Sequence, residues 1–138
     1  MERLCRVLPA LWRGESVDDP ELGLAAASLG PLGIDPPPIA VGGTSEEAIS
    51  VAARAADAWN ANESDPDAYE RLAQRMDELC VETGRRVART VQFFDRALGP
   101  DVRDRIARFE AAGATTVTFV ISEDMGPDSV LRLAQAVL

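Results

Sequence analysis

Residues 36–60 read PPPIAVGGTSEEAISVAARAADAWN, and this stretch predicts the fold of the chain around it. The apolar run IAV predicts a short strand, and Gly42 and Gly43 predict a tight turn at its end. Thr44 is the predicted N-cap of the helix that follows, because Glu47 stands three residues later, as in a capping box. The stretch therefore predicts a strand, a glycine turn and a helix N-terminus in succession.

A glycine turn in front of a helix is suited to bind an anion. The first N–H groups of a helix have no intrahelical partner, and the helix dipole places partial positive charge beside them. Glycine has no side chain to keep a phosphate away from these groups. We therefore interpret Gly42, Gly43, Thr44 and Ser45 as a candidate phosphate site, with a simple chain turn as the structural alternative.

Length and charge restrict the class of protein. A chain of 138 residues fits one domain, and a domain of that size buries roughly two-thirds of its unfolded surface. The formal net charge is −9, which repels phosphate backbones and anionic lipids, so we expect neither nucleic acid nor a membrane as partner. No apolar run approaches the ~18 residues of a membrane span, and we expect no signal peptide or anchor but a cytoplasmic protein.

The sequence offers few groups for catalysis or metal binding. Cys5 and Cys80 are far apart and lack CxxC spacing, so we expect two buried thiols, no disulfide and no metal site. There is no histidine, which removes the commonest general base and metal ligand. Asp57 and Asp124 are candidates for proton transfer, with surface or capping roles as the alternative. We assign no catalytic residue.

The first part of the chain is predicted to be a helix and a long loop. Residues 2–13 have apolar side chains at helical spacing, which predicts a short amphipathic helix that ends or is interrupted near Pro9. Its apolar residues are Leu4, Leu8, Leu11 and Trp12. Residues 14–38 are rich in glycine and proline and predict a long loop with one helical turn at most. We expect either a lid or partner-contact segment here, or a surface loop.

Strand and helix patterns alternate through the rest of the chain. A helix begins at Ser64 or Asp65, has Pro66 in its first turn and ends before Gly84. Another begins after Pro100, and a last one begins near residue 127. Strands are predicted at residues 57–60 and 87–94, and a buried strand, rich in β-branched residues, at 115–121. This alternation predicts an α/β fold made of βα units with a parallel sheet.

Five segments, in order, resemble the luciferase-like oxidoreductases: PPPIAVGG, AARAADAWN, CVETGR, RTVQFF and FEAAGATTVTFVI. The earlier segment LPALWRGE is similar to the helix and linker that precede the first of these in the family. This superfamily contains FMN-dependent monooxygenases and enzymes that use the deazaflavin coenzyme F-420. Its fold is a (β/α)₈ TIM barrel of about 250 residues. The resemblance therefore implies that residues 1–138 form a single partial barrel domain, the C-terminal half.

The resemblance also implies a cofactor site. Gly42, Gly43, Thr44 and Ser45 match the glycine turn that receives the phosphate of FMN or coenzyme F-420, and Trp59 and Asn60 are expected near the mouth of the barrel. For Trp59 the alternative is a core aromatic. Two departures bear on this site. Ser45 stands where the family often has a third glycine, before the negative charges of Glu46 and Glu47, and Ala58 replaces a glycine.

Two functions follow from the resemblance. The first is a component of an FMN- or deazaflavin-dependent oxidoreductase, active in hydride transfer or monooxygenation once a partner completes the site. The alternative is a non-catalytic half-barrel that scaffolds or regulates a related full-length enzyme, or a remnant without a defined task. A half-barrel leaves strand edges unpaired and exposes an apolar face. We therefore expect a homo-oligomer or a complex with a fuller luciferase-like subunit.

Overall fold

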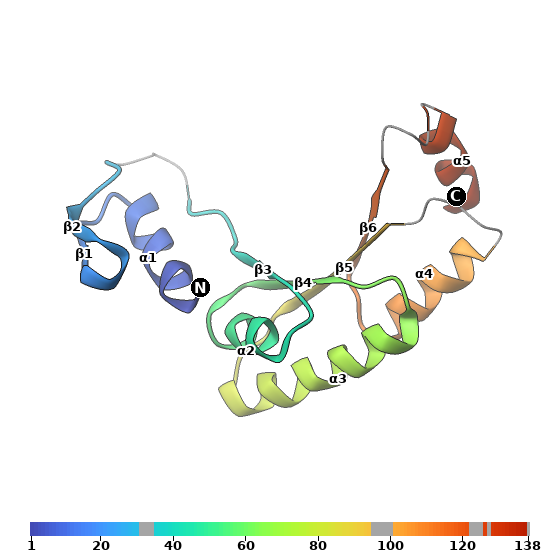
Figure 1. Ribbon diagram of the computed structural model, residues 1–138, viewed down its shortest axis with the longest axis horizontal. Helices are drawn as coiled ribbons and strands as arrows, with labels where there is room; N and C mark the ends of the chain where they lie inside the picture. The colour runs from blue at the N-terminus through green and yellow to red at the C-terminus, as the bar shows by residue number, and fades with distance from the viewer. Residues whose placement is uncertain (31–34, 95–100, 122–125, 127, 138) are drawn as a thin grey trace.

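The computed structural model describes residues 1–30, 35–94, 101–121, 126 and 128–137. Its described strands and helices alternate as the sequence predicts after residue 38 (Figure 1). In chain order the elements are α1 Glu2–Trp12, β1 Val17–Asp19, the 3₁₀ turn η1 Pro20–Leu22, β2 Leu24–Ala27, β3 Ala40–Gly42, α2 Glu46–Ala55, β4 Ala58–Asn62, α3 Pro66–Thr83, β5 Ala88–Phe94, α4 Val102–Ala111, β6 Thr116–Val120 and α5 Asp128–Val137.

The main sheet has four parallel strands in the order β3-β4-β5-β6. Each neighbouring pair is joined through one helix, so the predicted α/β fold with βα units and a parallel sheet is confirmed. α2, α3 and α4 lie on one side of this sheet, and no described element covers its other side (Figure 1). The sheet is therefore covered by helices on one face only, which is unusual for parallel strands.

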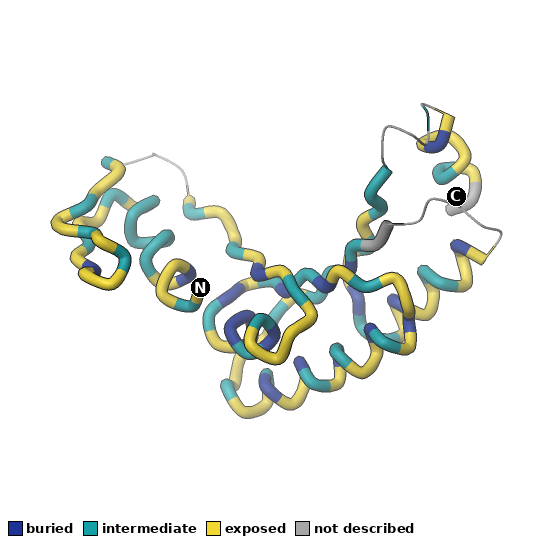
Figure 2. The backbone as a smooth tube through the Cα atoms, viewed as in Figure 1, coloured by how far each residue is buried: buried dark blue, intermediate teal, exposed yellow. Residues whose placement is uncertain are grey.

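The core lies between the sheet and these helices (Figure 2). Trp59 on β4 stacks on Tyr69 of α3, with ring centroids 5.8 Å apart, and Tyr69 meets the Phe109 ring edge-on at 5.4 Å. All three side chains are fully buried. Ile49, Met76 and Val91 are other fully buried apolar side chains in this layer. The three aromatic rings tie β4, α3 and α4 together.

Two rows of small and polar side chains lie on the open face of the sheet. Trp59, Ala61 and Val91 are buried and point to the helices. Because side chains alternate along a strand, the residues before and after each of them point to the open face. Two cross-strand rows result, Gly42–Asn60–Thr90–Thr116 and Asn62–Gln92–Thr118. The expectation of an exposed apolar face was therefore wrong for these rows.

The predicted loop over residues 14–38 contains regular structure that the sequence did not indicate. β1 and β2 form an antiparallel pair in which Val17 is opposite Ala27, and the expected single helical turn is η1 between them. The carboxylate of Asp19 caps η1 by accepting the N–H groups of Glu21 and Leu22, both at 3.1 Å. Three- and four-residue strands are too short for alternation to reveal them, which is why the loop prediction was wrong here.

Helix boundaries mostly follow the predicted caps. α3 has Asp65 as N-cap, Pro66 in its first turn and Gly84 in the left-handed conformation after its end, as predicted. α1 continues through Pro9 to Trp12 instead of ending there. Pro100 and Pro127, expected just ahead of the last two helices, lie outside the described residues. None of the described helices is long and apolar enough to cross a membrane.

Two burial predictions were wrong. Cys5 is buried, but Cys80 is only half-buried, and both are free thiols. β6 was expected to be a buried strand, yet Thr116 and Thr118 are exposed and Val117 is half-buried. β6 is the last strand of the described sheet, and helices cover only one of its faces. A β-branched composition therefore did not indicate burial at this edge.

Candidate functional site

The glycine turn lies where β3 ends and α2 begins. Gly42 pairs with Asn60 of β4, and the Gly43 N–H donates to the Asn60 carbonyl oxygen at 3.0 Å. Gly43 has φ +131°, and an added Cβ would lie 3.0 Å from the Cβ of Ala48. A residue with a side chain is strained at this position, so the turn requires glycine.

Gly42 differs from its neighbour. It is exposed, and an added Cβ would meet only the Asn60 carbonyl oxygen, at an ordinary contact distance of 3.7 Å. Gly42 stands in the row of Asn60 and Thr90, which is directed to the open face. The absence of a side chain at Gly42 is therefore not required by the fold, and it leaves backbone accessible beside the turn.

Trp59 contacts the glycine turn from the core side of the sheet. Its indole Nε1 donates to the carbonyl oxygen of Gly43 at 2.8 Å, while the ring itself is fully buried against Tyr69. The ring of Trp59 is therefore a core aromatic, which was the alternative interpretation, and its indole N–H positions the glycine turn. A buried ring cannot contact a cofactor on the open face directly, so any role of Trp59 in binding is through Gly43.

Asn60 and Thr90 form a polar pair beside the turn. The Thr90 hydroxyl donates to Asn60 Oδ1 at 2.8 Å, and it also lies 3.3 Å from the Trp59 carbonyl oxygen. Both side chains are half-buried on the open face. This contact fixes the orientation of the Asn60 amide and leaves its N–H₂ group to donate to a ligand. Thr90 therefore orients Asn60, which the sequence analysis names as a candidate site residue.

The predicted N-cap of α2 was Thr44, and this prediction was wrong, because the N-cap is Ser45. Ser45 is extended, and its hydroxyl accepts the N–H of Ala48 at 3.2 Å. The residue at the third helical position is thus Ala48, so Thr44 and Glu47 do not form the expected capping box. Thr44 is exposed in the turn itself, and its hydroxyl is available beside the first N–H groups of α2.

Glu46 and Glu47 occupy the first turn of α2, as predicted, and they differ in their surroundings. Arg75 of α3 binds the Glu46 carboxylate through Nε at 2.9 Å and Nη2 at 2.7 Å, and also binds Glu78. This hydrogen bonding to Arg75 lowers the pKa of Glu46. The charge of Glu46 therefore has a counter-ion on α3, whereas no ion pair of Glu47 occurs within the described residues.

Of the two aspartates considered for proton transfer, only Asp57 lies within the described residues. The Asp57 carboxylate accepts the Ile39 N–H at 2.8 Å, which is a structural role at the start of β4. Asp124 lies outside the described residues. In the part of the chain that the structure covers, no group of three or more acidic, cysteine or histidine side chains is placed to hold a metal.

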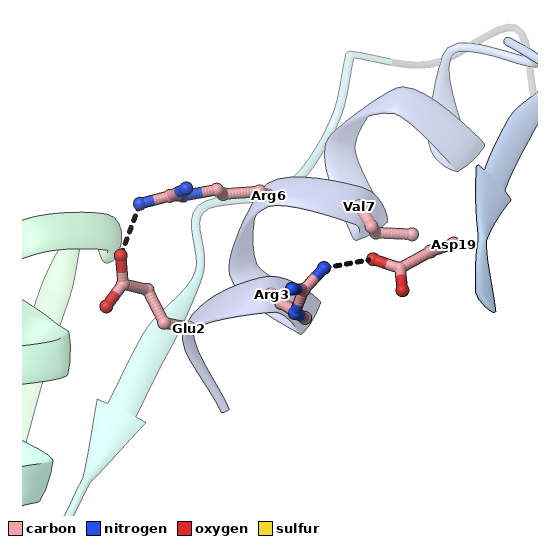
Figure 3. Close-up of a pocket in the computed structure, with 5 residues that line it drawn as sticks. All are labelled: Glu2, Arg3, Arg6, Val7 and Asp19. Carbon is pink, nitrogen blue, oxygen red and sulfur yellow. Dashed lines mark hydrogen bonds and ion pairs between the residues drawn. The ribbon is translucent and has the colours of Figure 1, made fainter. Parts of the chain in front are cut away.

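A cavity of about 430 Å³ lies between α1 and the β1–β2 hairpin (Figure 3). Its charged groups are paired: Arg3 binds buried Asp19 at 3.3 Å, and Glu2 binds Arg6 and, at 2.9 Å, Arg54 of α2. Hydrogen bonding to Arg54 lowers the pKa of Glu2. These contacts fasten α1 to the hairpin and to α2, and so explain the charges without a ligand. The lining residues are Glu2, Arg3, Arg6, Val7 and Asp19.

The residues around the glycine turn fit a phosphate-sized anion. The Thr44 hydroxyl and the N–H groups in the first turn of α2 are hydrogen-bond donors. Gly42 has no side chain and leaves room for the anion beside them. The structure thus brings the six predicted residues to one end of the sheet: Gly42, Gly43, Thr44, Ser45, Trp59 and Asn60. Sequence reasoning missed Thr90 and Arg75. The alternation of Thr90 and Gln92 with Val91 was the available signal for Thr90.

Comparison with known proteins gives two kinds of match. The family model of luciferase-like monooxygenases matches residues 2–97. Uncharacterized proteins of Mycobacterium bovis and of two Mycobacterium tuberculosis strains are each 34% identical to this chain over 122 residues. Each match covers 86% of this chain and 39% of the relative, so the chain spans about two fifths of the length of these curated relatives.

Proposed function

Because this chain belongs to the luciferase-like monooxygenase family, we propose that it forms the phosphate-binding part of a flavin-type oxidoreductase. The cofactor is FMN or the deazaflavin coenzyme F-420, and its phosphate binds at Gly42–Ser45. When bound, the cofactor supplies the hydride-transfer or oxygen chemistry. The residues of this chain bind and orient its phosphate end. We place this function in the cytoplasm, as the composition predicts.

One observation supports the proposal most: the glycine turn is held from two sides. Asn60 accepts the Gly43 N–H and Trp59 donates to the Gly43 carbonyl, so the turn is preorganised before a ligand arrives. A rigid turn loses little conformational entropy on binding. A simple connection between a strand and a helix does not need a buried indole to fix its carbonyl group.

The proposal includes a larger fold around the site. We propose that the four parallel strands, with helices on one face, are half of a (β/α)₈ barrel, and that the polar rows of the open face line the barrel interior. The resemblance assigns the platform for the flavin ring and most substrate contacts to the other half. The complete site therefore needs a luciferase-like partner segment, and the present chain contributes the phosphate end.

FMN and riboflavin together test the phosphate site. They share the isoalloxazine ring and ribityl chain and differ by the phosphate, so the ratio of their affinities isolates the phosphate contribution. We expect the purified chain to bind FMN in equilibrium dialysis, to bind riboflavin at least about tenfold more weakly, and to release FMN to inorganic phosphate. Tenfold corresponds to about 1.4 kcal/mol, the size of one good charge-assisted hydrogen bond. Equal affinities would show that no phosphate site exists.

A matched pair of variants locates the effect. Gly42→Asp places a carboxylate at the turn, and Gly42→Asn places an amide of the same size there; the space beside Gly42 accepts either. We expect the aspartate variant to lose the preference for FMN over riboflavin, because its charge repels the phosphate, and the asparagine variant to keep most of it. Equal loss in both would indicate a steric effect and count against an anion at this turn.

The second candidate function is the non-catalytic half-barrel that scaffolds or regulates a related enzyme. The observation in its favour is the acidic first turn of α2, where Glu47 lies beside the proposed phosphate without a described ion pair. A chain that binds neither FMN nor the deazaflavin coenzyme, and yet forms a stable complex with a full-length family member, would establish this function. The same two measurements therefore separate the candidates.

A further inference from the structure

Arg75 of α3 binds the carboxylate that stands at the start of α2. Its Nε donates to both carboxylate oxygens of Glu46, at 2.9 and 3.2 Å, and its Nη2 donates to the nearer oxygen at 2.7 Å. Its Nη1 donates at 2.7 Å to Glu78, which lies one turn further along α3. Two of the three guanidinium nitrogen atoms therefore hold Glu46. Such paired hydrogen bonds fix the direction of the carboxylate as well as balancing its charge.

This ion pair joins two helices that the core already holds together. α2 packs against α3, and both contribute side chains such as Ile49 and Met76 to one buried cluster. By contrast, the Arg75 side chain is 38% exposed and that of Glu46 is 61% exposed. Ion pairs as exposed as this one contribute little to stability, because water and salt screen them. The packing of α2 on α3 therefore does not depend on Arg75.

The position of Glu46 points to a different role for the ion pair. Glu46 is the first residue of α2, beside the N–H groups that are proposed to bind phosphate. The helix dipole and these donors attract a carboxylate as they attract a phosphate. An unpaired Glu46 would therefore compete with the phosphate for the donors and also repel it. Arg75 balances the charge of Glu46 and holds its carboxylate toward α3.

Glu47, the second acidic residue of this turn, lies on the other side of α2. It lines two cavities on the side of α1, with volumes of about 210 and 410 Å³. Arg3 and Arg54 belong to the lining of the larger cavity. The two acidic side chains are thus directed to opposite neighbours, Glu46 to α3 and Glu47 to the side of α1. Among the ion pairs of the described residues, only that of Glu46 involves the first turn of α2.

We propose that Arg75 is a positioning residue of the phosphate site, which neutralises Glu46 and keeps its carboxylate away from the first N–H groups of α2. Arg75 acts through Glu46 and not by contact with the phosphate. The inference rests on the proposed function, because it concerns the binding of a phosphate at Gly42–Ser45. It adds the reason why a helix that begins with two glutamates accepts an anion.

The test measures the ratio of FMN affinity to riboflavin affinity by equilibrium dialysis, for the complete 138-residue chain and its variants. Arg75→Gln removes the charge that balances Glu46, and Arg75→Lys keeps it. Glu46→Gln combined with Arg75→Gln removes both charges. Arg86→Gln is the control with the same change in net charge. Arg86 is exposed and precedes β5, so it lies at the opposite end of the parallel sheet from the glycine turn.

We expect Arg75→Gln to reduce the preference for FMN at least about fivefold, the order expected for one uncompensated charge near a doubly charged phosphate. In about 0.1 M salt, where charges are screened over about 10 Å, Arg86→Gln is expected to change the preference less than about twofold. Arg75→Lys is expected to keep most of the preference, and the double variant to restore it. A double variant as weak as Arg75→Gln, or an equal loss in Arg86→Gln, would overturn the proposal.

Salt separates an effect of charge from an effect of structure. In about 1 M salt the screening length falls to about 3 Å, so the difference between Arg75→Gln and the unmodified chain is expected to shrink. A difference that stays the same would show that Arg75 acts by holding the helices, and would refute the proposed role.

Glu46→Gln decides if circular dichroism shows that Arg75→Gln is unfolded. This variant removes the competing carboxylate and leaves Arg75 in place, so a stronger preference for FMN supports the proposal, and an unchanged or weaker preference refutes it. The unmodified chain separates this inference from the proposed function. Equal affinities for FMN and riboflavin refute both, whereas a clear preference for FMN that Arg75→Gln does not alter refutes only the role of Arg75.

Discussion

The indole Nε1 of Trp59 donates a hydrogen bond to the carbonyl oxygen of Gly43 across 2.8 Å. It links the buried aromatic layer of the core to the glycine turn. The ring of Trp59 is fixed by its stack on Tyr69, and the turn is fixed by the ring. Core packing and the shape of the candidate site are therefore coupled through one hydrogen bond.

Replacement of this indole tests the coupling. Trp59→Phe keeps an aromatic ring against Tyr69 but leaves the Gly43 carbonyl without its donor. We expect a loss of about 2–3 kcal/mol in the free energy of unfolding, from the hydrogen bond and the smaller ring together. Urea denaturation measures this loss. Amide exchange of Gly43 and Thr44 is expected to become faster even where the rest of the protein stays protected. Unchanged exchange at both amides would show that the indole does not hold the turn.

The two glycines of the turn are predicted to respond differently to alanine. Gly43→Ala adds a Cβ at φ +131°, 3.0 Å from Ala48 Cβ, and is expected to cost about 1–3 kcal/mol of stability. Gly42→Ala adds a Cβ that meets only the Asn60 carbonyl oxygen, at an ordinary contact distance. It is expected to change stability by less than about 0.5 kcal/mol. Thermal and urea unfolding of both variants make the comparison. A larger loss for Gly42→Ala would contradict this geometry.

The hydroxyl of Tyr69 is buried and has no hydrogen-bond partner among the described residues. An unsatisfied buried hydroxyl is costly, so Tyr69→Phe is expected to leave the protein as stable as before at pH 7 or more stable by about 1 kcal/mol. The ring stack and the edge contact with Phe109 remain in this variant. A clear loss of stability in urea denaturation would mean that the hydroxyl is hydrogen-bonded in solution.

The same residue predicts an alkaline transition. Burial raises the pKa of the Tyr69 hydroxyl to about 12, whereas an unfolded tyrosine titrates near pH 10. The neutral form is favoured in the folded state, so the stabilisation is complete below about pH 10 and is lost as the pH rises toward 12.

This transition is readily assigned, because the sequence contains one tyrosine and no lysine. Absorbance at the tyrosinate band, followed against pH, gives the pKa directly. Tyr69→Phe is expected to lack the alkaline loss of stability between pH 10 and 12. The same loss in both proteins would assign it to another group.

Ala26 is in the left-handed region, with φ 46°, although it has a side chain. Its N–H donates to the Asp18 carboxylate at 2.7 Å, which holds this conformation in the hairpin. Ala26→Gly is expected to stabilise the protein by about 1 kcal/mol, because glycine adopts positive φ without strain. Ala25→Gly, in the same strand, provides the control and is expected to destabilise by about 0.5–1 kcal/mol through backbone entropy. Equal effects in thermal unfolding would contradict the strained conformation.

The order of elements after residue 38 could be predicted because each depends on local chemistry. Asp65, Pro66 and Gly84 bound α3 through a cap, a fixed φ and a left-handed turn, all of which act within a few residues. The β1–β2 hairpin could not be predicted, because short strands are stabilised by each other and by Asp19, and not by their own composition. Ser45 replaced Thr44 as N-cap for a similar reason: both residues suit the position, and the turn geometry selects one.

The candidate site divides in the same way. Gly42, Gly43, Thr44 and Ser45 form one continuous turn that the sequence indicated, and Trp59 and Asn60 were added by resemblance. Arg75 and Thr90 were missed because they reach the site from other elements, Arg75 from α3 and Thr90 from β5, and no local pattern marks such a contact.

After residue 38, the sequence by itself determined which segments are strands, helices and turns, because caps, glycines and apolar periodicity act over short distances. It also determined the family, through five short segments in order. Only the tertiary structure decided which face of the sheet is open and polar, and that the indole of Trp59 holds Gly43. These features depend on parallel strand register, which brings residues far apart in the chain into one row, and register is set when the strands pair.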